Sequence, residues 1–258
     1  MSFNKLPSKA SLPAEPFKIN ISDDKISKMK QLIELSPIAD LTYESKLKDR
    51  SLGLNRDWLV NAVDSWQNHY DWYVNTMLPP FNFTMPPDTH KETRKKSETH
   101  MNSFPHFKAP INTTKGTLKI HFAALFSSKD DAIPIILIHG WPGSFIEFLP
   151  MLDLYRKQYT PQTLPYHLIV PSLPGYAFSD APPLDDDFTQ EDVASVLHEL
   201  MLGLGCSKGY VAQGGDLGSN LSRIMVKTYD ACKAAHSKLI PPFLSIAEIP
   251  GRRSQVSF

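Results

Sequence analysis

The residues best suited to chemistry form a short glycine-rich motif, Gly214-Gly215-Asp216-Leu217-Gly218. It directly follows the apolar run GYVAQ and precedes a helical stretch, which is the setting of a nucleophile elbow, a tight strand-to-helix turn. Gly214 and Gly218 are needed because side chains at those positions would collide. The pattern therefore predicts that the carboxylate of Asp216 is exposed as a nucleophile. The alternative is an ordinary glycine-rich turn in which Asp216 caps the helix.

A second motif could stabilise negative charge. The apolar run IPIILI ends in His139-Gly140-Trp141-Pro142, and such a loop can offer a backbone N–H to a developing oxyanion. We predict that the donors are the backbone N–H groups of Trp141 and of Leu217, the residue after the nucleophile. We interpret His139 as a structural residue that organises the loop with Gly140 and Pro142, and not as an acid or base.

Alternating strands and helices would position these motifs from about residue 116 onward. Short apolar runs predict strands at TLKIHFAAL, IPIILIHG, YHLIVPSL and KGYVAQGG. Helical patterns lie near FIEFLPMLDLY, within TQEDVASVLHELMLGL and at LGSNLSRIMVKTY. This alternation predicts an α/β fold with βαβ units, a mostly parallel sheet with flanking helices, and right-handed crossovers. In such a sheet Asp216 lies at the C-terminal edge.

Three ordered motifs together resemble the epoxide hydrolase family and its α/β-hydrolase fold. They are HGWPGSFIEF, PSLPGYAFSD and GYVAQGGDLGS. Upstream, PFKINISDDKI, WLVNAVDSWQNHYDW and FPHFKAPI before KIHF are typical of the N-terminal domain of the microsomal branch. The resemblance covers most of residues 16–236.

The resemblance implies hydrolysis of a small apolar epoxide to a vicinal diol, EC class 3.3.2, without a cofactor or metal. Asp216 would open the ring to form an alkyl ester, which water then hydrolyses with the help of a general-base histidine. In the family the base lies near the C-terminus, an acid orients it and cap tyrosines hold the epoxide oxygen, but none of these can be placed here. His236 is the sole histidine after Asp216. It is expected low in the sheet, at the start of the strand after the elbow helix, and away from the nucleophile.

The first part of the chain predicts a helical meander. A capped amphipathic helix is expected at residues 22–35, and a second helix at residues 56–72 carries an aromatic stripe that we interpret as core packing. We expect an N-terminal domain at residues 1–115, an incomplete α/β-hydrolase core at 116–236 and an aberrant tail at 237–258. Residues 73–93 resemble an insertion. Our hypothesis is that untranslated or alternatively spliced sequence has entered at both of these places.

The overall composition limits the classes of partner that the chain is expected to bind. Lys and Arg number 27 and so do Asp and Glu, so no net charge favours nucleic acid or an anionic membrane. The two cysteines, Cys206 and Cys232, have no metal-ligand spacing, which suits a reducing compartment. No signal peptide or spanning helix is visible, and we expect a cytoplasmic protein. Peripheral association with a membrane needs no spanning segment and stays open.

Two other functions compete with the epoxide hydrolase hypothesis. A haloalkane dehalogenase uses the same aspartate elbow, but the long N-terminal segment favours the epoxide branch. The second is a catalytically dead fragment, either a nonfunctional product or a binding partner of intact homologues.

Overall fold

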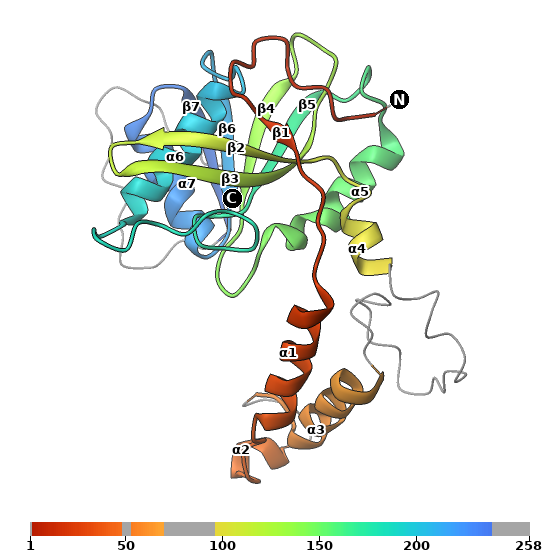
Figure 1. Cartoon of the computed structure of the whole chain (residues 1–258). Coiled ribbons are helices and arrows are strands. Elements are labelled where there is room, and N and C mark those ends of the chain that lie inside the picture. Colours follow the sequence, from red (N-terminus) through yellow and green to blue (C-terminus); the bar gives the residue numbers. More distant parts are fainter. Residues whose placement is uncertain (1, 48–52, 70–95, 239–258) are drawn as a thin grey trace. The chain divides into compact units, whose positions relative to one another are not determined.

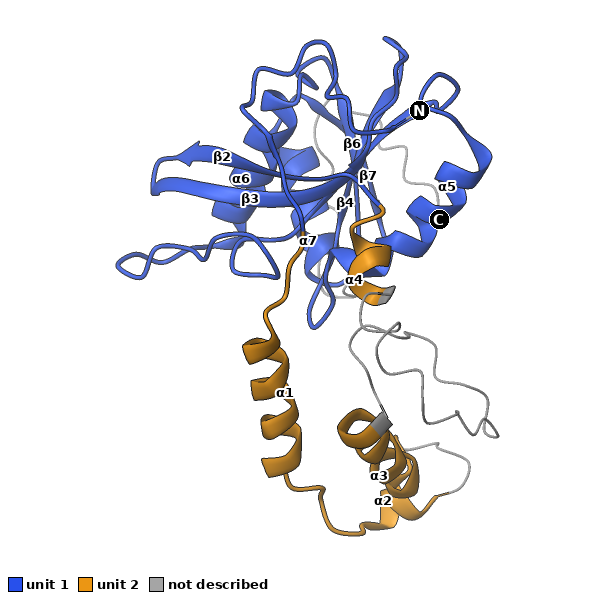
Figure 2. Ribbon diagram, turned by 45° about the vertical axis from the view of Figure 1, so that its right-hand side comes forward, with its two compact units in different colours: residues 1–18, 104–258 blue, residues 19–103 orange. Residues whose placement is uncertain are grey.

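The computed structural model describes residues 2–47, 53–69 and 96–238 (Figure 1). The predicted insertion at 73–93 and nearly all of the predicted tail lie outside these ranges. Two compact units are present: residues 1–18 with 104–258, and residues 19–103 (Figure 2). Residues 104–115, which the sequence groups with the N-terminal segment, belong to the unit that holds the sheet. No helix in the described ranges is long and apolar enough to cross a bilayer.

The first unit is built on one mixed sheet with the order β1-β2-β3-β5-β4-β6-β7. The strands are β1 (Glu15–Pro16), β2 (His106–Thr113), β3 (Gly116–Leu125), β4 (Ile133–Ile138), β5 (Tyr166–Pro171), β6 (Tyr210–Gly214) and β7 (Cys232–Ser237). Strands β5, β4, β6 and β7 are parallel neighbours, which confirms the predicted parallel sheet. Strands β1, β2 and β3 pair antiparallel, and β3 pairs antiparallel with β5. The sequence patterns did not predict β1 or β2.

Helices follow the strands as the alternation predicted. They are η3 (Phe145–Phe148), α5 (Leu149–Gln158), α6 (Gln190–Gly203) and α7 (Leu217–Thr228). Helices α6 and α7 pack side by side, and α7 contacts β4, β6 and β7 (Figure 1). Helices α6 and α7 each bury an apolar stripe in the core. The stripes contribute Leu197 and Leu200 of α6 and Leu221 and Met225 of α7, beside Ile136 and Ile138 of β4.

The second unit consists of helices in its described ranges. They are α1 (Asp23–Leu35), α2 (Tyr43–Lys46), α3 (Arg56–Asp64), the π-helical turn η1 (Ser65–His69) and α4 (Lys96–Met101). The predicted helix at 22–35 is confirmed, and the Ser22 side chain caps it by accepting from the Lys25 N–H at 3.4 Å.

The aromatic stripe on α3 and η1 packs less completely than predicted. Of its described members only Ala62 is buried, and Trp66 is 41% exposed. The prediction that Trp66 packs in the core is therefore wrong. The reason is that η1 contacts α1 but few other elements, so no element in the described ranges covers the whole stripe. Tyr70 lies outside the described residues.

Candidate active site

The backbone at Asp216 has the conformation of a nucleophile elbow. Asp216 follows β6 and precedes α7, and its φ of 53° and ψ of −123° are unfavourable for a residue with a side chain. A Cβ added at Gly214 would collide with the backbone of Gly218, and one added at Gly218 would collide with the carbonyl oxygen of Ile138. Both positions therefore require glycine, as the sequence motif predicted. The Asp216 side chain forms no capping hydrogen bond with the second or third residue of α7, where an N-cap aspartate would bond, so the alternative of an ordinary cap is not supported.

The carboxylate of Asp216 lies against the loop after β4. Its Oδ1 accepts a hydrogen bond from the Trp141 N–H at 2.8 Å. Hydrogen bonding from the backbone of Trp141, and then of Leu217, lowers the pKa of Asp216 below its ordinary value, although slight burial opposes this. The Trp141 N–H, one of the two donors predicted for an oxyanion, thus already holds one aspartate oxygen. The carboxylate stays ionised at neutral pH, as a nucleophile must.

Gly140 sets how closely the two loops approach. A Cβ added to Gly140 would lie 2.5 Å from the Cβ of Asp216 and 2.6 Å from its Oδ1. In the same loop, the peptide bond between Trp141 and Pro142 is cis. The Trp141 side chain is exposed, so this residue contacts the Asp216 carboxylate through its backbone N–H and not through its ring.

His139 anchors the loop that follows β4, residues 139–142, which we call the oxyanion loop. Its ring is fully buried, its Nε2 accepts the Leu173 N–H at 3.1 Å, and its Nδ1 lies 3.0 Å from the Gly140 carbonyl oxygen. Because Nε2 is an acceptor, Nδ1 carries the proton and donates it to that carbonyl. Burial lowers the pKa of His139, which keeps the ring neutral. These contacts support the interpretation of His139 as a residue that orders the loop.

A second buried histidine network lies beside the same loop and was not predicted. His106 Nδ1 and His121 Nε2 are 3.0 Å apart, and His121 Nδ1 is 2.8 Å from Ser172 Oγ. Ser172 precedes Leu173, the partner of His139. Phe145, which follows the oxyanion loop, packs edge-on against both histidine rings. The sequence signal was a histidine within each of two apolar strands, in FPHF and KIHF.

Glu147 is a further acidic group near the nucleophile that the sequence analysis missed. Its carboxylate lies over Gly143, so a Cβ added there would meet its Oε2. Burial first, and then the charge of Asp216, raises the pKa of Glu147, while Lys238 opposes the shift. Glu147 lies on η3, directly after the oxyanion loop. No sequence motif marks it, because only the fold brings it near Asp216.

His236 lies in a different place from the one predicted. It is near the C-terminal end of β7, paired with Gln213 of β6, and its side chain is exposed. The prediction that it lies at the start of the strand is wrong, because β7 already begins at Cys232. Among the described residues no histidine forms a hydrogen bond with Asp216.

Comparison with known proteins agrees with this geometry. The family described as "Epoxide hydrolase N terminus" matches residues 14–78 and 91–148, and the α/β-hydrolase fold family matches residues 133–251. A putative epoxide hydrolase of Dothistroma septosporum is 40% identical over 252 residues, covering 96% of this chain and 54% of the relative.

Solved structures give the same result. The epoxide hydrolase of Aspergillus niger is 43% identical, with a TM-score of 0.77 over 97% of this chain and 60% of that one. The juvenile hormone epoxide hydrolase of the silkworm Bombyx mori is 27% identical, with a TM-score of 0.64 over 92% of this chain and 57% of that one.

The fold therefore defines an α/β-hydrolase, in which Asp216 occupies the tight turn between β6 and α7. The chain belongs to the epoxide hydrolase family of the microsomal type, with its characteristic N-terminal region. It spans about half the length of the curated relatives that it matches.

Proposed function

We propose that this chain supplies the nucleophile and the oxyanion hole of an epoxide hydrolase that acts on a small apolar epoxide. The observation that carries the proposal is the strained elbow at Asp216, with one carboxylate oxygen held at 2.8 Å by the Trp141 N–H. The other carboxylate oxygen is left to attack.

The geometry suits a two-step reaction. A carboxylate oxygen of Asp216 attacks an epoxide carbon, the ring C–O bond breaks, and the released alkoxide takes a proton from water to give a hydroxyalkyl ester. The oxygen held by Trp141 then becomes the carbonyl oxygen of that ester. When water attacks the carbonyl carbon, negative charge develops on this same oxygen, to which the Trp141 N–H already donates. Collapse releases the diol and restores Asp216.

The second step also needs a base to activate water. The described residues offer Asp216 no histidine partner. Without a base, ester hydrolysis is expected to slow by roughly 10²–10⁴-fold. The proposal for the isolated 258-residue chain is therefore slow alkylation of Asp216 followed by accumulation of the ester.

Intact-mass spectrometry with styrene oxide tests this proposal. The expected result is one added substrate mass, mapped to the peptide that contains Asp216 and absent from Asp216→Asn. Asp185→Asn, which removes an exposed carboxylate elsewhere, should label like the wild type. Labelling that persists in Asp216→Asn would place the nucleophile elsewhere.

The same experiment tests the competing hypothesis of a catalytically dead fragment. Folded protein that shows neither adduct nor diol would establish that reading. Sustained turnover would show that the chain contains a base. Release of halide from 1-bromobutane without epoxide labelling would instead indicate a dehalogenase.

A further inference from the structure

A lysine-rich cavity lies at the end of the sheet opposite Asp216. It has a volume of about 530 Å³ and is lined at the first residues of β4, β5, β6 and β7, among them Ile133, His167, Tyr210 and Lys233. Asp216 instead follows the last residue of β6. The cavity is therefore separate from the candidate active site, and nothing about it depends on the proposed function.

Fixed segments form the walls of this cavity. The N-terminal arm is pinned on both sides: Phe126 N–H donates to the Phe3 carbonyl at 3.0 Å, and Leu12 N–H donates to the Gly203 carbonyl at 2.9 Å. Between these points the arm contributes residues 5–9 to the lining. Gly205, with a φ of 86°, lies so close to the backbone of Lys9 that a Cβ would stand 2.7 Å from it. The cavity is thus built before any ligand arrives.

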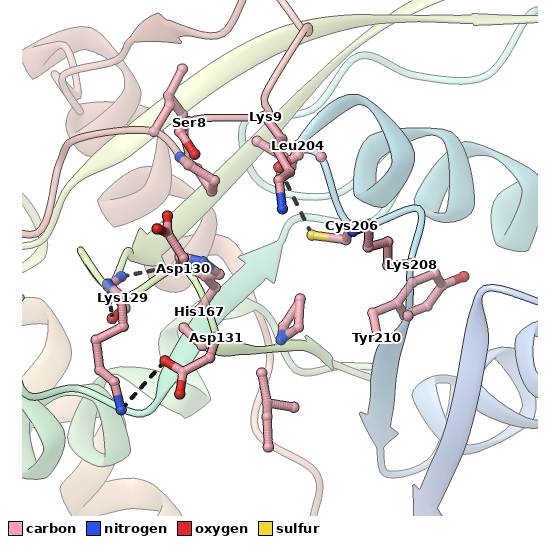
Figure 3. Close-up of a pocket in the computed structure, with 18 of the residues that line it drawn as sticks. Ser8, Lys9, Lys129, Asp130, Asp131, His167, Leu204, Cys206, Lys208 and Tyr210 are labelled. Carbon is pink, nitrogen blue, oxygen red and sulfur yellow. Dashed lines mark hydrogen bonds and ion pairs between the residues drawn. The ribbon is translucent and has the colours of Figure 1, made fainter.

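The charge of the lining differs from that of the chain. Five lysines surround the cavity, against two aspartates, Asp130 and Asp131, whereas the whole chain has no net charge. Figure 3 shows Lys9, Lys129 and Lys208 on three different segments around the cavity. The five lysines are Lys5, Lys9, Lys129, Lys208 and Lys233.

Most of these lysines have no acidic partner. Within the described ranges, Lys129 is the one member of the five that forms an ion pair, with Asp131 at 3.5 Å (Figure 3). The other four lysines have exposed side chains and give the lining an excess of positive charge, which favours an anionic ligand. The aliphatic stem of Lys233 packs over Gly209, which holds this lysine at the rim.

The lining also has an apolar part. Leu6, Ile133 and Val211 contribute to it beside the lysines. A volume of this size falls in the range of roughly 300–1,000 Å³ that accommodates small-molecule ligands. Lysine binds phosphate as a point charge, and an apolar wall suits a carbon skeleton.

We infer that this cavity binds a small organic molecule that carries a phosphate group. The phosphate lies among Lys5, Lys9, Lys208 and Lys233, and the organic group lies against the apolar wall. A free phosphorylated metabolite and a phospholipid headgroup present the same chemistry, and the experiment distinguishes them.

Calorimetric titration of the 258-residue chain with phenyl phosphate tests the inference at low ionic strength. Lys208→Gln combined with Lys233→Gln should raise the Kd by about tenfold, because two exposed charge contacts are lost. The matched control, Lys157→Gln with Lys227→Gln, removes the same charge from exposed positions outside the lining and should leave the Kd within about twofold. Equal weakening by both pairs, or no binding at millimolar phenyl phosphate, would overturn the inference.

A second variant works in the opposite direction. Asp130→Asn removes an acidic group from the lining and should tighten binding, which guards against misreading a poorly folded lysine variant. Weaker or unchanged binding would count against the cavity. Sedimentation with phosphatidylcholine vesicles, with and without phosphatidic acid, then identifies the source. Binding only to the acidic vesicles, reversed by phenyl phosphate, assigns a headgroup, whereas phenyl phosphate binding without vesicle binding assigns a free metabolite.

Discussion

At the scale of single residues, the distance between Gly140 and Asp216 controls the candidate site. Gly140→Ala would place a methyl group 2.5 Å from the Asp216 Cβ, so the loop must move and the Trp141 N–H must leave the carboxylate. Loss of one such donor is expected to slow hydrolysis of the ester by about 10²-fold, because the oxyanion develops in that step. The measurement is the rate at which the preformed styrene oxide adduct disappears after excess epoxide is removed, followed by intact mass.

Gly215→Ala is the matched control in the neighbouring motif. The nearest atom to a Cβ there is the Lys238 Cβ at 3.8 Å, an ordinary contact. This variant should react within about twofold of the wild type, since no donor is displaced. An equal loss in both variants would mean that the elbow tolerates no substitution and that the distance at Gly140 is not the cause.

His121 links one buried side chain to the pH dependence of stability. Burial first, and then the charges of His106 and Lys108, lowers the pKa of His121 from 6.5 to about 2. Below pH 6.5 the unfolded chain takes up a proton that the native chain does not. Stability therefore falls as the pH drops from about 6.5 toward 2, by up to about 1.4 kcal/mol per pH unit for this group.

Urea unfolding between pH 7 and pH 4 checks this prediction. His121→Gln removes the titrating group. The free energy of unfolding of this variant should therefore change less steeply with pH, by up to the slope that corresponds to one bound proton. The variant should also be less stable at pH 7. Identical slopes for His121→Gln and the wild type would show that His121 is protonated in the native state.

At the scale of elements, α6 depends on its N-terminal cap. Thr189 Oγ1 accepts the Asp192 N–H at 3.3 Å, and Asp192 Oδ2 accepts the Thr189 N–H at 2.8 Å. Lys115 joins this capping box through Asp192 at 3.1 Å, which connects the helix to the turn between β2 and β3. Thr189→Ala should lower the free energy of unfolding by about 1 kcal/mol. Thr189→Ser keeps the hydroxyl, and a similar loss there would show that the methyl group matters and not the cap.

At the scale of the whole molecule, the first 18 residues complete the unit formed by residues 104–238. Strand β1 pairs with β2, and Leu12 packs against α6 at Gly203. Leu12→Ala should lower the free energy of unfolding by about 1–2 kcal/mol, because a half-buried leucine loses its apolar contact. Leu184→Ala, at a fully exposed leucine, should leave thermal unfolding unchanged. A normal melting temperature for Leu12→Ala would show that the arm does not stabilise this unit.

The sequence alone determined the local geometry of the candidate site. The glycines at 214 and 218 specify a turn that only glycine tolerates, and the alternating apolar runs specify the strands and helices around it. These signals lie within a few residues of one another, so backbone sterics and periodicity are enough to read them. The same applies to the cap at Ser22.

The tertiary structure decided which distant residues meet. The Trp141 N–H and the Asp216 carboxylate are 75 residues apart, and they meet because β4 and β6 are neighbours in the sheet. His106 and Ser172 share His121 because β3 lies between β2 and β5. The lysine cavity likewise joins the N-terminal arm to the starts of four strands. Periodicity predicts each strand but not its neighbours, since strand order follows from how the whole core packs, and no local pattern encodes that.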